Sequence, residues 1–391
     1  MEGAARLNRS AAHPRVLMIY WGFDASACLC GYLQCSWLAE QGEISFRHKR
    51  AVEVRQEDLV WADTVVFVRG HTALEAWIAK RCHAAGKYLL YILDDDLLHV
   101  PEYLGSASYY ALPSVRRHVL DVMQACDGLV SPSRRLLSRY GDGFSKTFQI
   151  SEPAVGLLRT PKGWPDGRVR IGFAGSLDRG RDIDAILSEA LRQITKTYQE
   201  RVVIEFFGVE TSIARELGCR TYPYLASYEE YQRQMDQLNW DIGLAPMPES
   251  PFHACKHYNK LVEYSGHGIA GIYSSVPPYT DAVRDGETGL LCENTTEAWI
   301  AAISRLIEDR RLRESISAAC LTQAGSDFSV EKSAADFGSA LYSLPDRAED
   351  CGPHYAGILK YLGIGSWFLE KVWCRIRKVG GETVKKEDEQ P

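Results

Sequence analysis

Short runs of hydrophobic residues alternate along the chain with longer stretches in which hydrophobic and polar residues are mixed. In the first part of the chain, the hydrophobic runs predict strands at residues 16–20, 44–46, 64–68, 88–93 and 128–131. The intervening stretches predict helices at 25–40, 73–85 and 114–125. Strands that are almost continuously hydrophobic and alternate with helices are typical of a parallel sheet covered on both faces.

The same pattern restarts after a stretch rich in proline and glycine between Ile150 and Arg168, which we interpret as an interdomain linker. The later hydrophobic runs predict strands at 169–174, 202–208, 241–245, 269–273 and 289–291. Helices are predicted at 182–197, 227–239, 257–265, 296–310 and 311–323. We therefore predict an α/β protein with two doubly wound parallel-sheet domains, at 14–155 and 168–345. Ligands of such sheets bind outside the carboxyl ends of the strands, and two facing domains would place the main cleft between them.

The last segment, residues 352–391, has a different pattern. Its part at 354–378 mixes aromatic and aliphatic residues with Lys360, Lys371, Arg375, Arg377 and Lys378. One interpretation is an amphipathic helix that lies on an anionic membrane surface. The other is a terminal helix that packs against the first domain while its lysine stems cover apolar surface.

Composition and charge exclude several classes of protein. The 391 residues are 46% hydrophobic and 25% charged, which is close to a globular average and excludes a disordered or collagen-like chain. The formal charge of −6 gives no indication of nucleic-acid binding. The 11 cysteines are scattered and odd in number, as expected of reduced thiols in a cytosolic protein. We find no signal peptide and no apolar run of about 18 residues, so we expect a cytoplasmic protein without a membrane-spanning helix.

The first candidate for chemistry is the glycine-rich turn at residues 172–182, which follows a predicted strand and opens a helix. Small residues such as Gly175 and Ser176 allow the backbone to approach a phosphate, and a helix N-terminus offers free N–H groups. Arg179 and Arg181 would add contacts to an anion. The turn matches neither common nucleotide-binding fingerprint, and tight strand-to-helix turns also need glycine for steric reasons alone.

The second candidate is a set of residues that share one face of the helix predicted around 257–265. Lys256, Lys260, Glu263 and His267 follow each other at spacings of four, three and four. Two lysines and a carboxylate at this place could hold a diphosphate and a ribose. The alternative is a solvated charged face with ordinary ion pairs between neighbouring turns.

Taken together, GFAGS with a following Arg and Asp, DIGLAP, KHYNKLVEY, GHGIAGIYSSVPPY and GETGLL resemble the donor domain of glycosyltransferases with the GT-B fold. The similarity is greatest to retaining, family 4-like enzymes, especially bacterial ones that build surface polysaccharides. The first half agrees more loosely, through ADTVVFVRGH, GKYLLYILDDDLLHVP and CDGLVSPSRRL. The resemblance covers about residues 14–345 and is strong over 169–295.

The resemblance implies roles for individual residues. Gly175 and Ser176 would lie against the donor diphosphate, which Lys260 and Arg179 or Arg181 would neutralise. Glu263 would bind the nucleotide ribose. The remaining donor-side positions are Lys256 and Tyr279, the latter in the loop after a strand.

The chain departs from the family at one position. The family pattern is Glu-x7-Glu, and here the first position is Cys255 while the second is Glu263. Since the first Glu normally faces the donor sugar, this contact is altered or is supplied by a neighbour such as His253 or Lys256.

The implied reaction moves a sugar from a nucleotide diphosphate to an acceptor hydroxyl with retention of configuration. It needs no cofactor and no metal, because fixed cations stabilise the leaving diphosphate. The implied partners are a nucleotide sugar and a glycan or lipid-linked glycan. Under the membrane interpretation, the tail at 354–378 would contact the inner face of the membrane; under the packing interpretation it would not. No nucleic acid is expected.

The acceptor side is predicted from residues that follow strands of the first domain. Asp94-Asp95-Asp96 contains Asp-x-Asp, for which we consider a divalent metal site, a simple strand-end turn, or acceptor contacts by Asp95 and Asp96. Arg69 and His71 follow another strand, and His71 is the candidate catalytic residue on this side. Gly22 and Phe23 follow the first strand.

Two other functions compete with this interpretation. A non-hydrolysing sugar-nucleotide 2-epimerase shares the two-domain form and needs no separate acceptor. A non-catalytic subunit would keep the fold and only bind the nucleotide sugar, and Cys255 favours that alternative.

Overall fold

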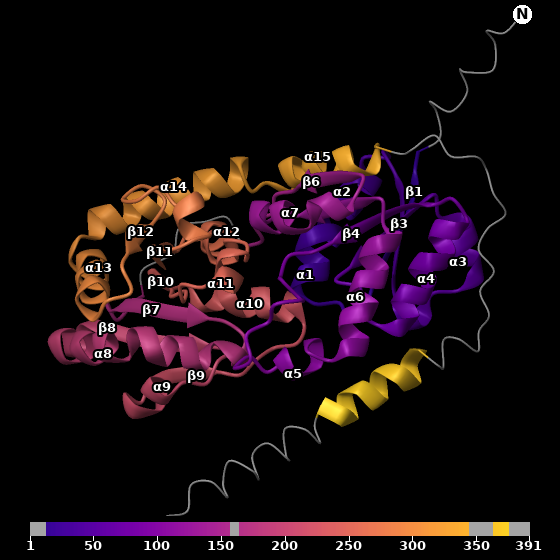
Figure 1. Cartoon of the computed structure of the whole chain (residues 1–391). Coiled ribbons are helices and arrows are strands. Elements are labelled where there is room, and N and C mark those ends of the chain that lie inside the picture. Colours follow the sequence, from indigo (N-terminus) through magenta and orange to yellow (C-terminus); the bar gives the residue numbers. More distant parts are fainter. Residues whose placement is uncertain (1–12, 157–163, 344–362, 375–391) are drawn as a thin grey trace, which may run out of the picture. The chain divides into compact units, whose positions relative to one another are not determined.

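The computed structural model describes residues 13–156, 164–343 and 363–374. The chain divides into two compact units. The N-terminal unit comprises the residues up to Ile150 together with those from Ala334 onward, and the C-terminal unit comprises Ser151–Ser333. Figure 1 shows each unit as a sheet with helices packed around it.

The N-terminal unit contains a six-stranded parallel sheet in the order β2-β1-β3-β4-β5-β6. The strands are β1 (Arg15–Tyr20), β2 (Ser45–Arg50), β3 (Thr64–Val68), β4 (Tyr88–Ile92), β5 (Gly128–Ser131) and β6 (Lys146–Gln149). The central strands are buried throughout, as their hydrophobic runs predict. Because β1 pairs with β2 on one side and β3 on the other, the order reverses there, and a ligand is expected at the carboxyl ends of β1 and β3.

Helices connect these strands. They are α1 (Ala25–Ala27), a π-helix (Cys28–Tyr32), α2 (Leu33–Glu40), α3 (Gln56–Trp61), α4 (Ala73–Ala84), α5 (Ala107–Tyr110), α6 (Pro113–Ala125) and α7 (Arg134–Tyr140). Two of these helices show familiar signals at their start. The Thr72 side chain accepts from the Glu75 backbone N–H and Glu75 caps in return, and Pro113 occupies the first turn of α6.

The C-terminal unit contains a second six-stranded parallel sheet, in the order β12-β11-β10-β7-β8-β9. The strands are β7 (Val169–Ala174), β8 (Val202–Phe207), β9 (Arg220–Tyr222), β10 (Ile242–Ala245), β11 (Ala270–Ser274) and β12 (Leu290–Cys292). Counted within the unit this is the doubly wound order 3-2-1-4-5-6, whose switch point lies between β7 and β10.

The helices of this unit are α8 (Gly180–Tyr198), α9 (Ser212–Glu216), α10 (Tyr228–Leu238), α11 (Pro251–Ala254), α12 (Asn259–His267), α13 (Thr296–Glu308) and α14 (Arg310–Ser326). One side of the sheet packs on α8 and α13 in a core that includes Leu187, Leu191, Trp299 and Ile303. A second core contains Trp240, whose indole lies so close to Gly172 of β7 that a Cβ there would come well within 3.0 Å of it. Glycine is therefore required at this position of the strand.

The chain returns to the N-terminal unit through α15 (Val330–Leu341). We expected the C-terminal domain to extend to residue 345. Instead, Ala334, Phe337, Ala340 and Leu341 belong to the core of the N-terminal unit, because they are completely buried in its hydrophobic cluster.

Residues 363–374 form a further helix of the N-terminal unit. The remainder of the predicted tail, 352–362 and 375–391, lies outside the described residues. Within the described ranges, no helix combines the length and hydrophobicity needed to cross a membrane.

Candidate functional site

In the C-terminal unit, the predicted glycine-rich turn links β7 to α8. The Gly175 N–H donates to the carbonyl of Phe207 (3.0 Å), which ties the turn to the end of β8. Ser176 is exposed and precedes the 3-10 turn Leu177–Arg179. A Cβ at Gly180 would collide with the carbonyl oxygen of Glu210, so the first residue of α8 must be glycine for the loops after β7 and β8 to meet.

Arg179 spans the switch point of the sheet. Its Nη2 donates to the carbonyl of Pro246 after β10 (2.8 Å), and its Nη1 lies 3.5 Å from the buried carboxylate of Asp182. The guanidinium is therefore anchored between the turn after β7 and the loop after β10. Arg181, the second residue of α8, is exposed. A fixed and an exposed cation thus share the N-terminal end of this helix.

The loops at the same edge are also linked to each other. The Met247 N–H donates to Ser274 Oγ (2.8 Å), and Ser274 Oγ donates to the Asn294 side-chain oxygen (2.6 Å). Asn294 Nδ2 returns a hydrogen bond to the Met247 carbonyl (2.9 Å). These bonds join the loops that follow β10 and β12 to the last residue of β11, so the edge is preorganised.

Two of the four residues predicted on one helix face, Lys260 and Glu263, form a compact cluster on α12. Lys260 Nζ lies 2.7 Å from Glu263 Oε1 and 3.3 Å from the hydroxyl of Tyr231. That hydroxyl donates to the Glu263 carboxylate, at 3.0 Å from each oxygen. Burial and the Glu263 charge hold the pKa of Tyr231 well above its usual range, so the phenol keeps its proton and remains a donor.

The Tyr231 ring in turn is fixed by stacking on Phe207 at the end of β8, with centroids 4.8 Å apart and an interplanar angle of 13°. Lys260 and Glu263 are partly covered, with side chains 18% and 14% exposed. Sequence reasoning missed Tyr231, because a tyrosine on the hydrophobic face of an amphipathic helix carries no signal of its own. The cluster offers one cation and one carboxylate held in a fixed relation.

Lys256 and His267 are placed differently from Lys260 and Glu263. The helix begins at Asn259, so Lys256 precedes it and lies over the Phe252 ring at 4.6 Å. His267 ends the helix and is buried, with Nε2 2.9 Å from Gln232 Oε1. The structure therefore brings Lys260 and Glu263 together, but not the whole predicted face.

Cys255 and its neighbours occupy the end of α11. The Cys255 side chain is buried. His253 is also buried, with Nδ1 2.8 Å from Ser250 Oγ and Nε2 3.7 Å from Asp182 Oδ2. Tyr279 follows β11 and is buried as well, with its ring 5.0 Å from that of Tyr273.

In the N-terminal unit, residues after β1 and β3 meet at the switch point of the sheet. Gly22 and Phe23 are exposed in the loop after β1. His71 Nδ1 is 2.7 Å from the Arg69 carbonyl. A carbonyl oxygen can only accept, so Nδ1 carries the proton and Nε2 of the neutral ring is an acceptor. The His71 ring lies 6.4 Å from that of Trp21, measured between centroids. Trp21 directly follows β1, so it too lies at the carboxyl end of a strand, where ligands of parallel sheets bind.

The three aspartates after β4 have different partners. Arg69, which adopts the left-handed conformation (φ 49°), pairs with Asp94 through two nitrogens and with Asp95 at 3.1 Å. Asp96 is buried. Its carboxylate accepts from Arg139 and Tyr140 and lies 3.0 Å from His99 Nδ1. Asp95 is therefore the most exposed of the three carboxylates at this edge.

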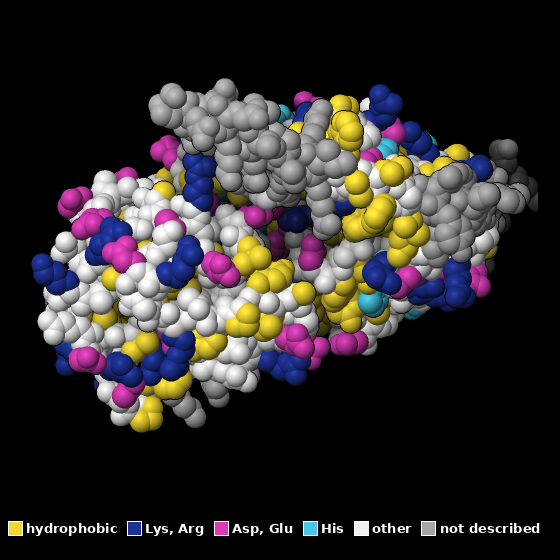
Figure 2. All heavy atoms as spheres, turned by 90° about the horizontal axis from the view of Figure 1, so that it is seen from below, with side chains coloured by type: hydrophobic (Ala, Val, Ile, Leu, Met, Phe, Trp, Pro, Cys, Tyr) yellow, Lys and Arg dark blue, Asp and Glu magenta, His cyan; other side chains and the backbone are white. Residues whose placement is uncertain are grey.

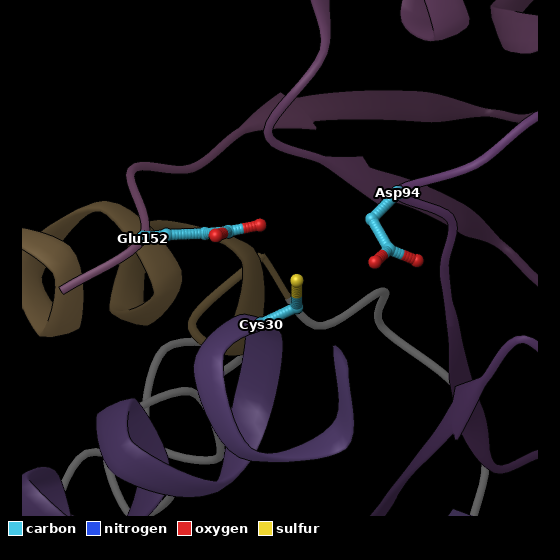
Figure 3. Close-up of side chains that lie close together, drawn as sticks. All are labelled: Cys30, Asp94 and Glu152. Carbon is cyan, nitrogen blue, oxygen red and sulfur yellow. The ribbon is translucent and has the colours of Figure 1, made fainter. Parts of the chain in front are cut away.

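Three buried side chains are of types that can ligate a metal ion, and Figure 3 shows them. Cys30 and Asp94 belong to the N-terminal unit, and Glu152 belongs to the C-terminal unit. Asp94 is paired with Arg69 within its own unit. Glu152 lies 3.4 Å from His257 Nδ1 within the other. We assign no metal site to these residues, because each carboxylate has a partner of its own.

No protein-family model and no curated protein sequence matches the chain. Solved structures do match. HepE from Anabaena, crystallised with UDP and glucose, has a TM-score of 0.61 and 16% identity over 85% of this chain and 100% of HepE. A glycosyltransferase from Rickettsia africae has a TM-score of 0.58 and 12% identity over 86% and 100%. A candidate UDP-N-acetylglucosamine 2-epimerase from Listeria monocytogenes has a TM-score of 0.51 and 12% identity over 87% and 99%. These likenesses confirm the expected GT-B fold class of two doubly wound units.

Proposed function

We propose that this protein is a glycosyltransferase that moves a sugar from a nucleoside diphosphate to an acceptor hydroxyl. The observation that carries the proposal is the cluster of Lys260, Glu263 and Tyr231 on the C-terminal unit. An ammonium suits the charge that develops on a leaving diphosphate, and a carboxylate suits the paired hydroxyls of a ribose. The HepE complex with UDP and glucose supports this assignment by analogy of fold.

The reaction breaks the bond between the anomeric carbon and the diphosphate oxygen and forms a bond to the acceptor oxygen, whose proton is released. Lys260 and Arg179 stabilise the negative charge that builds up on the diphosphate. Gly175, Ser176 and Arg181 hold its phosphates at the start of α8. Glu263 binds the ribose.

On the acceptor side we assign the hydroxyl contact to His71, whose Nε2 is an acceptor in the neutral ring. Gly22, Phe23, Arg69 and Asp95 would line the acceptor. Asp96 would act indirectly, because its carboxylate is held by Arg139 and Tyr140.

Several finer features belong to the same proposal. The transfer retains configuration, needs no metal and uses a glycan or a lipid-linked glycan as acceptor. The protein works in polysaccharide biosynthesis at the inner face of the membrane, which it contacts through the tail at 354–378. The resemblance of residues 169–295 to retaining family 4-like enzymes supports the retention of configuration. The basic and aromatic composition of the tail supports the membrane contact.

The first experiment measures binding and turnover separately. Calorimetric titration with UDP, GDP, ADP and dTDP should show tight binding of one of them, and incubation with the matching sugar nucleotides should release the diphosphate in the presence of an acceptor. The absence of binding to all four would exclude the donor site. Proton NMR of the product gives the anomeric configuration, and an inverted product would refute retention.

The similarity to the candidate epimerase favours a second function, interconversion of a sugar nucleotide at carbon 2. The two are separated by incubating the protein with a UDP-sugar and no acceptor. A new UDP-sugar with the same base would indicate the epimerase. Cys255, which stands where the family pattern has its first Glu, favours a third, non-catalytic function. Binding without turnover across several acceptors would indicate that function.

A further inference from the structure

The helix at residues 363–374 has two distinct faces. Gly363, Trp367, Glu370 and Cys374 recur at the spacing of one helical stripe, and all are buried or half-buried. Gly365, Phe368, Leu369, Val372 and Trp373 form another stripe of the same period. In this second stripe Phe368 is 61% exposed, Leu369 68% and Trp373 53%.

The first stripe, together with Lys371, attaches the helix to the N-terminal unit. Trp367 lies 5.0 Å from Trp21, measured between ring centroids, and Lys371 Nζ lies 3.9 Å over the Tyr109 ring. The Glu370 carboxylate lies 3.8 Å from His118 Nδ1 on α6. A Cβ at Gly363 would come within 3.0 Å of Leu74 on α4, so the helix approaches closely at this point.

The place of attachment is the switch point of the sheet. Trp21 directly follows β1, and its ring faces that of His71 after β3. The rings of Tyr109 and Tyr110 lie 5.7 and 5.8 Å from His71. The helix is thus joined by its aromatic residues to the edge of the sheet where the proposed acceptor residues gather.

The second stripe is unusual for a protein surface. Large apolar side chains next to each other on an exposed helix face mark a surface that is covered by another molecule. Figure 2 views the molecule from below, the side on which this helix is drawn in Figure 1, and shows hydrophobic side chains exposed on that face. Aromatic and aliphatic residues on one face, with basic residues nearby, are typical of helices that lie in the interface of a bilayer.

Charge favours an anionic bilayer over a protein partner. Between residues 354 and 378 the sequence has five basic residues, Lys360, Lys371, Arg375, Arg377 and Lys378, and a single acidic one, Glu370. Glu370 is buried against the N-terminal unit, and Lys371 lies over the Tyr109 ring of the same unit, so the excess positive charge comes from the other four basic residues of the sequence segment. Basic segments of this kind are attracted to anionic lipid headgroups over about a Debye length.

We propose that helix 363–374 docks on an anionic lipid bilayer through Phe368, Leu369 and Trp373, and that its opposite face holds the Trp21 and His71 edge of the N-terminal unit beside that surface. This inference deepens, and rests on, the membrane contact in the proposed function. It assigns the contact to three side chains and connects it to the acceptor residues. An acceptor carried on a lipid would then arrive where the helix is anchored.

The test compares vesicle binding of the full chain and of a double variant, Phe368→Ser with Leu369→Ser. Flotation with phosphatidylcholine vesicles that contain about a third phosphatidylglycerol should show binding by the parent chain, and at least a tenfold weaker partition of the variant. The matched control is the pair Val60→Ser and Leu120→Ser, two exposed apolar residues of the same unit, which should bind as the parent does. Equal binding by parent and Phe368/Leu369 variant would overturn the proposal.

A second measurement identifies the inserted residue. Brominated acyl chains should quench the fluorescence of the parent, and Trp373→Phe should lose most of this quenching while keeping its binding, because phenylalanine remains apolar. Unchanged quenching in Trp373→Phe would overturn the assignment. Light scattering tests the alternative that a second copy of the chain covers this helix face. A dimeric parent and a monomeric Phe368/Leu369 variant would show that alternative and overturn the docking on a bilayer.

Nucleotide binding separates this inference from the donor site. The Phe368/Leu369 variant should bind the nucleoside diphosphate with the affinity of the parent, because the helix belongs to the N-terminal unit. Loss of vesicle binding with unchanged nucleotide binding therefore supports the docking helix alone. A parent chain that binds vesicles but no nucleotide would leave the docking helix in place and exclude the donor site.

Discussion

Replacing Lys260 by methionine is the sharpest test of the donor site. Methionine keeps the length and the apolar stem of the side chain but removes the ammonium, so the change isolates one charge. In the parent, this ammonium lies 2.7 Å from Glu263 and 3.3 Å from the Tyr231 hydroxyl. After the replacement, Tyr231 still donates to Glu263, so that part of the cluster keeps its hydrogen bond.

The expected effect follows from how covered the cluster is. An ion pair on an open surface contributes about 0–1 kcal/mol, because water screens it. Lys260 and Glu263 are only 18% and 14% exposed, so the value for a hydrogen bond to a charged group applies, about 1.5–3 kcal/mol. At about 1.4 kcal/mol per factor of ten, the affinity for the nucleoside diphosphate should fall about 10- to 150-fold. Turnover should fall by about 10²- to 10³-fold, since the charge on the diphosphate is largest in the transition state.

The assay is calorimetric titration with the nucleoside diphosphate that binds the parent, and in parallel with its nucleoside. The nucleoside lacks phosphates, so its affinity should not change. Lys196→Met is the matched control, because Lys196 is exposed in the last turn of α8, at the end remote from the glycine-rich turn. Diphosphate affinity within twofold of the parent, or an equal loss for the nucleoside, would refute the role of Lys260.

Four further outcomes are expected. Gly172→Ala should lower the free energy of unfolding, measured by urea titration, by about 1–3 kcal/mol or more, because a Cβ has no room beside Trp240. Gly22→Ala is the control and should have little effect, because Gly22 lies in open space. Phe337→Ala should lower it by about 3–5 kcal/mol, because the ring is completely buried in the N-terminal core; a loss below 1 kcal/mol would contradict this. Burial lowers the pKa of His267, so its neutral form is favoured on folding; below about pH 6.5 the melting temperature should fall, and His267→Gln should flatten that slope. Turnover should be unchanged in excess EDTA, and a complete loss that Mg²⁺ reverses would show a required metal.

The sequence was most informative about the interior of the two sheets. Predicted strands such as 64–68 and 128–131 coincide with β3 and β5, because strands buried on both faces are continuous hydrophobic runs. The strands that the pattern missed, β6 and β9, both lie at a sheet edge. Their residues are largely exposed, so no hydrophobic run distinguishes them from loops.

The candidate site was predictable to the extent that local spacing determines it. Lys260 and Glu263 are three residues apart on one helix, so their proximity follows from helix geometry. Tyr231 joins them from another helix, and Trp367 reaches Trp21 from the end of the chain. Contacts of that kind depend on tertiary packing, which no spacing in the sequence encodes.

The path of the chain through α15 has a consequence for synthesis on the ribosome. The C-terminal unit is one continuous segment, Ser151–Ser333, inserted in the sequence of the N-terminal unit. At about 5–20 residues per second, the roughly 180 residues of the insert take about 10 to 40 s to make. During that time the first sheet lacks Phe337 and Leu341, which fill its core. The unit that is started first is therefore completed last, and its nascent form exposes an apolar surface while the second unit is already able to fold.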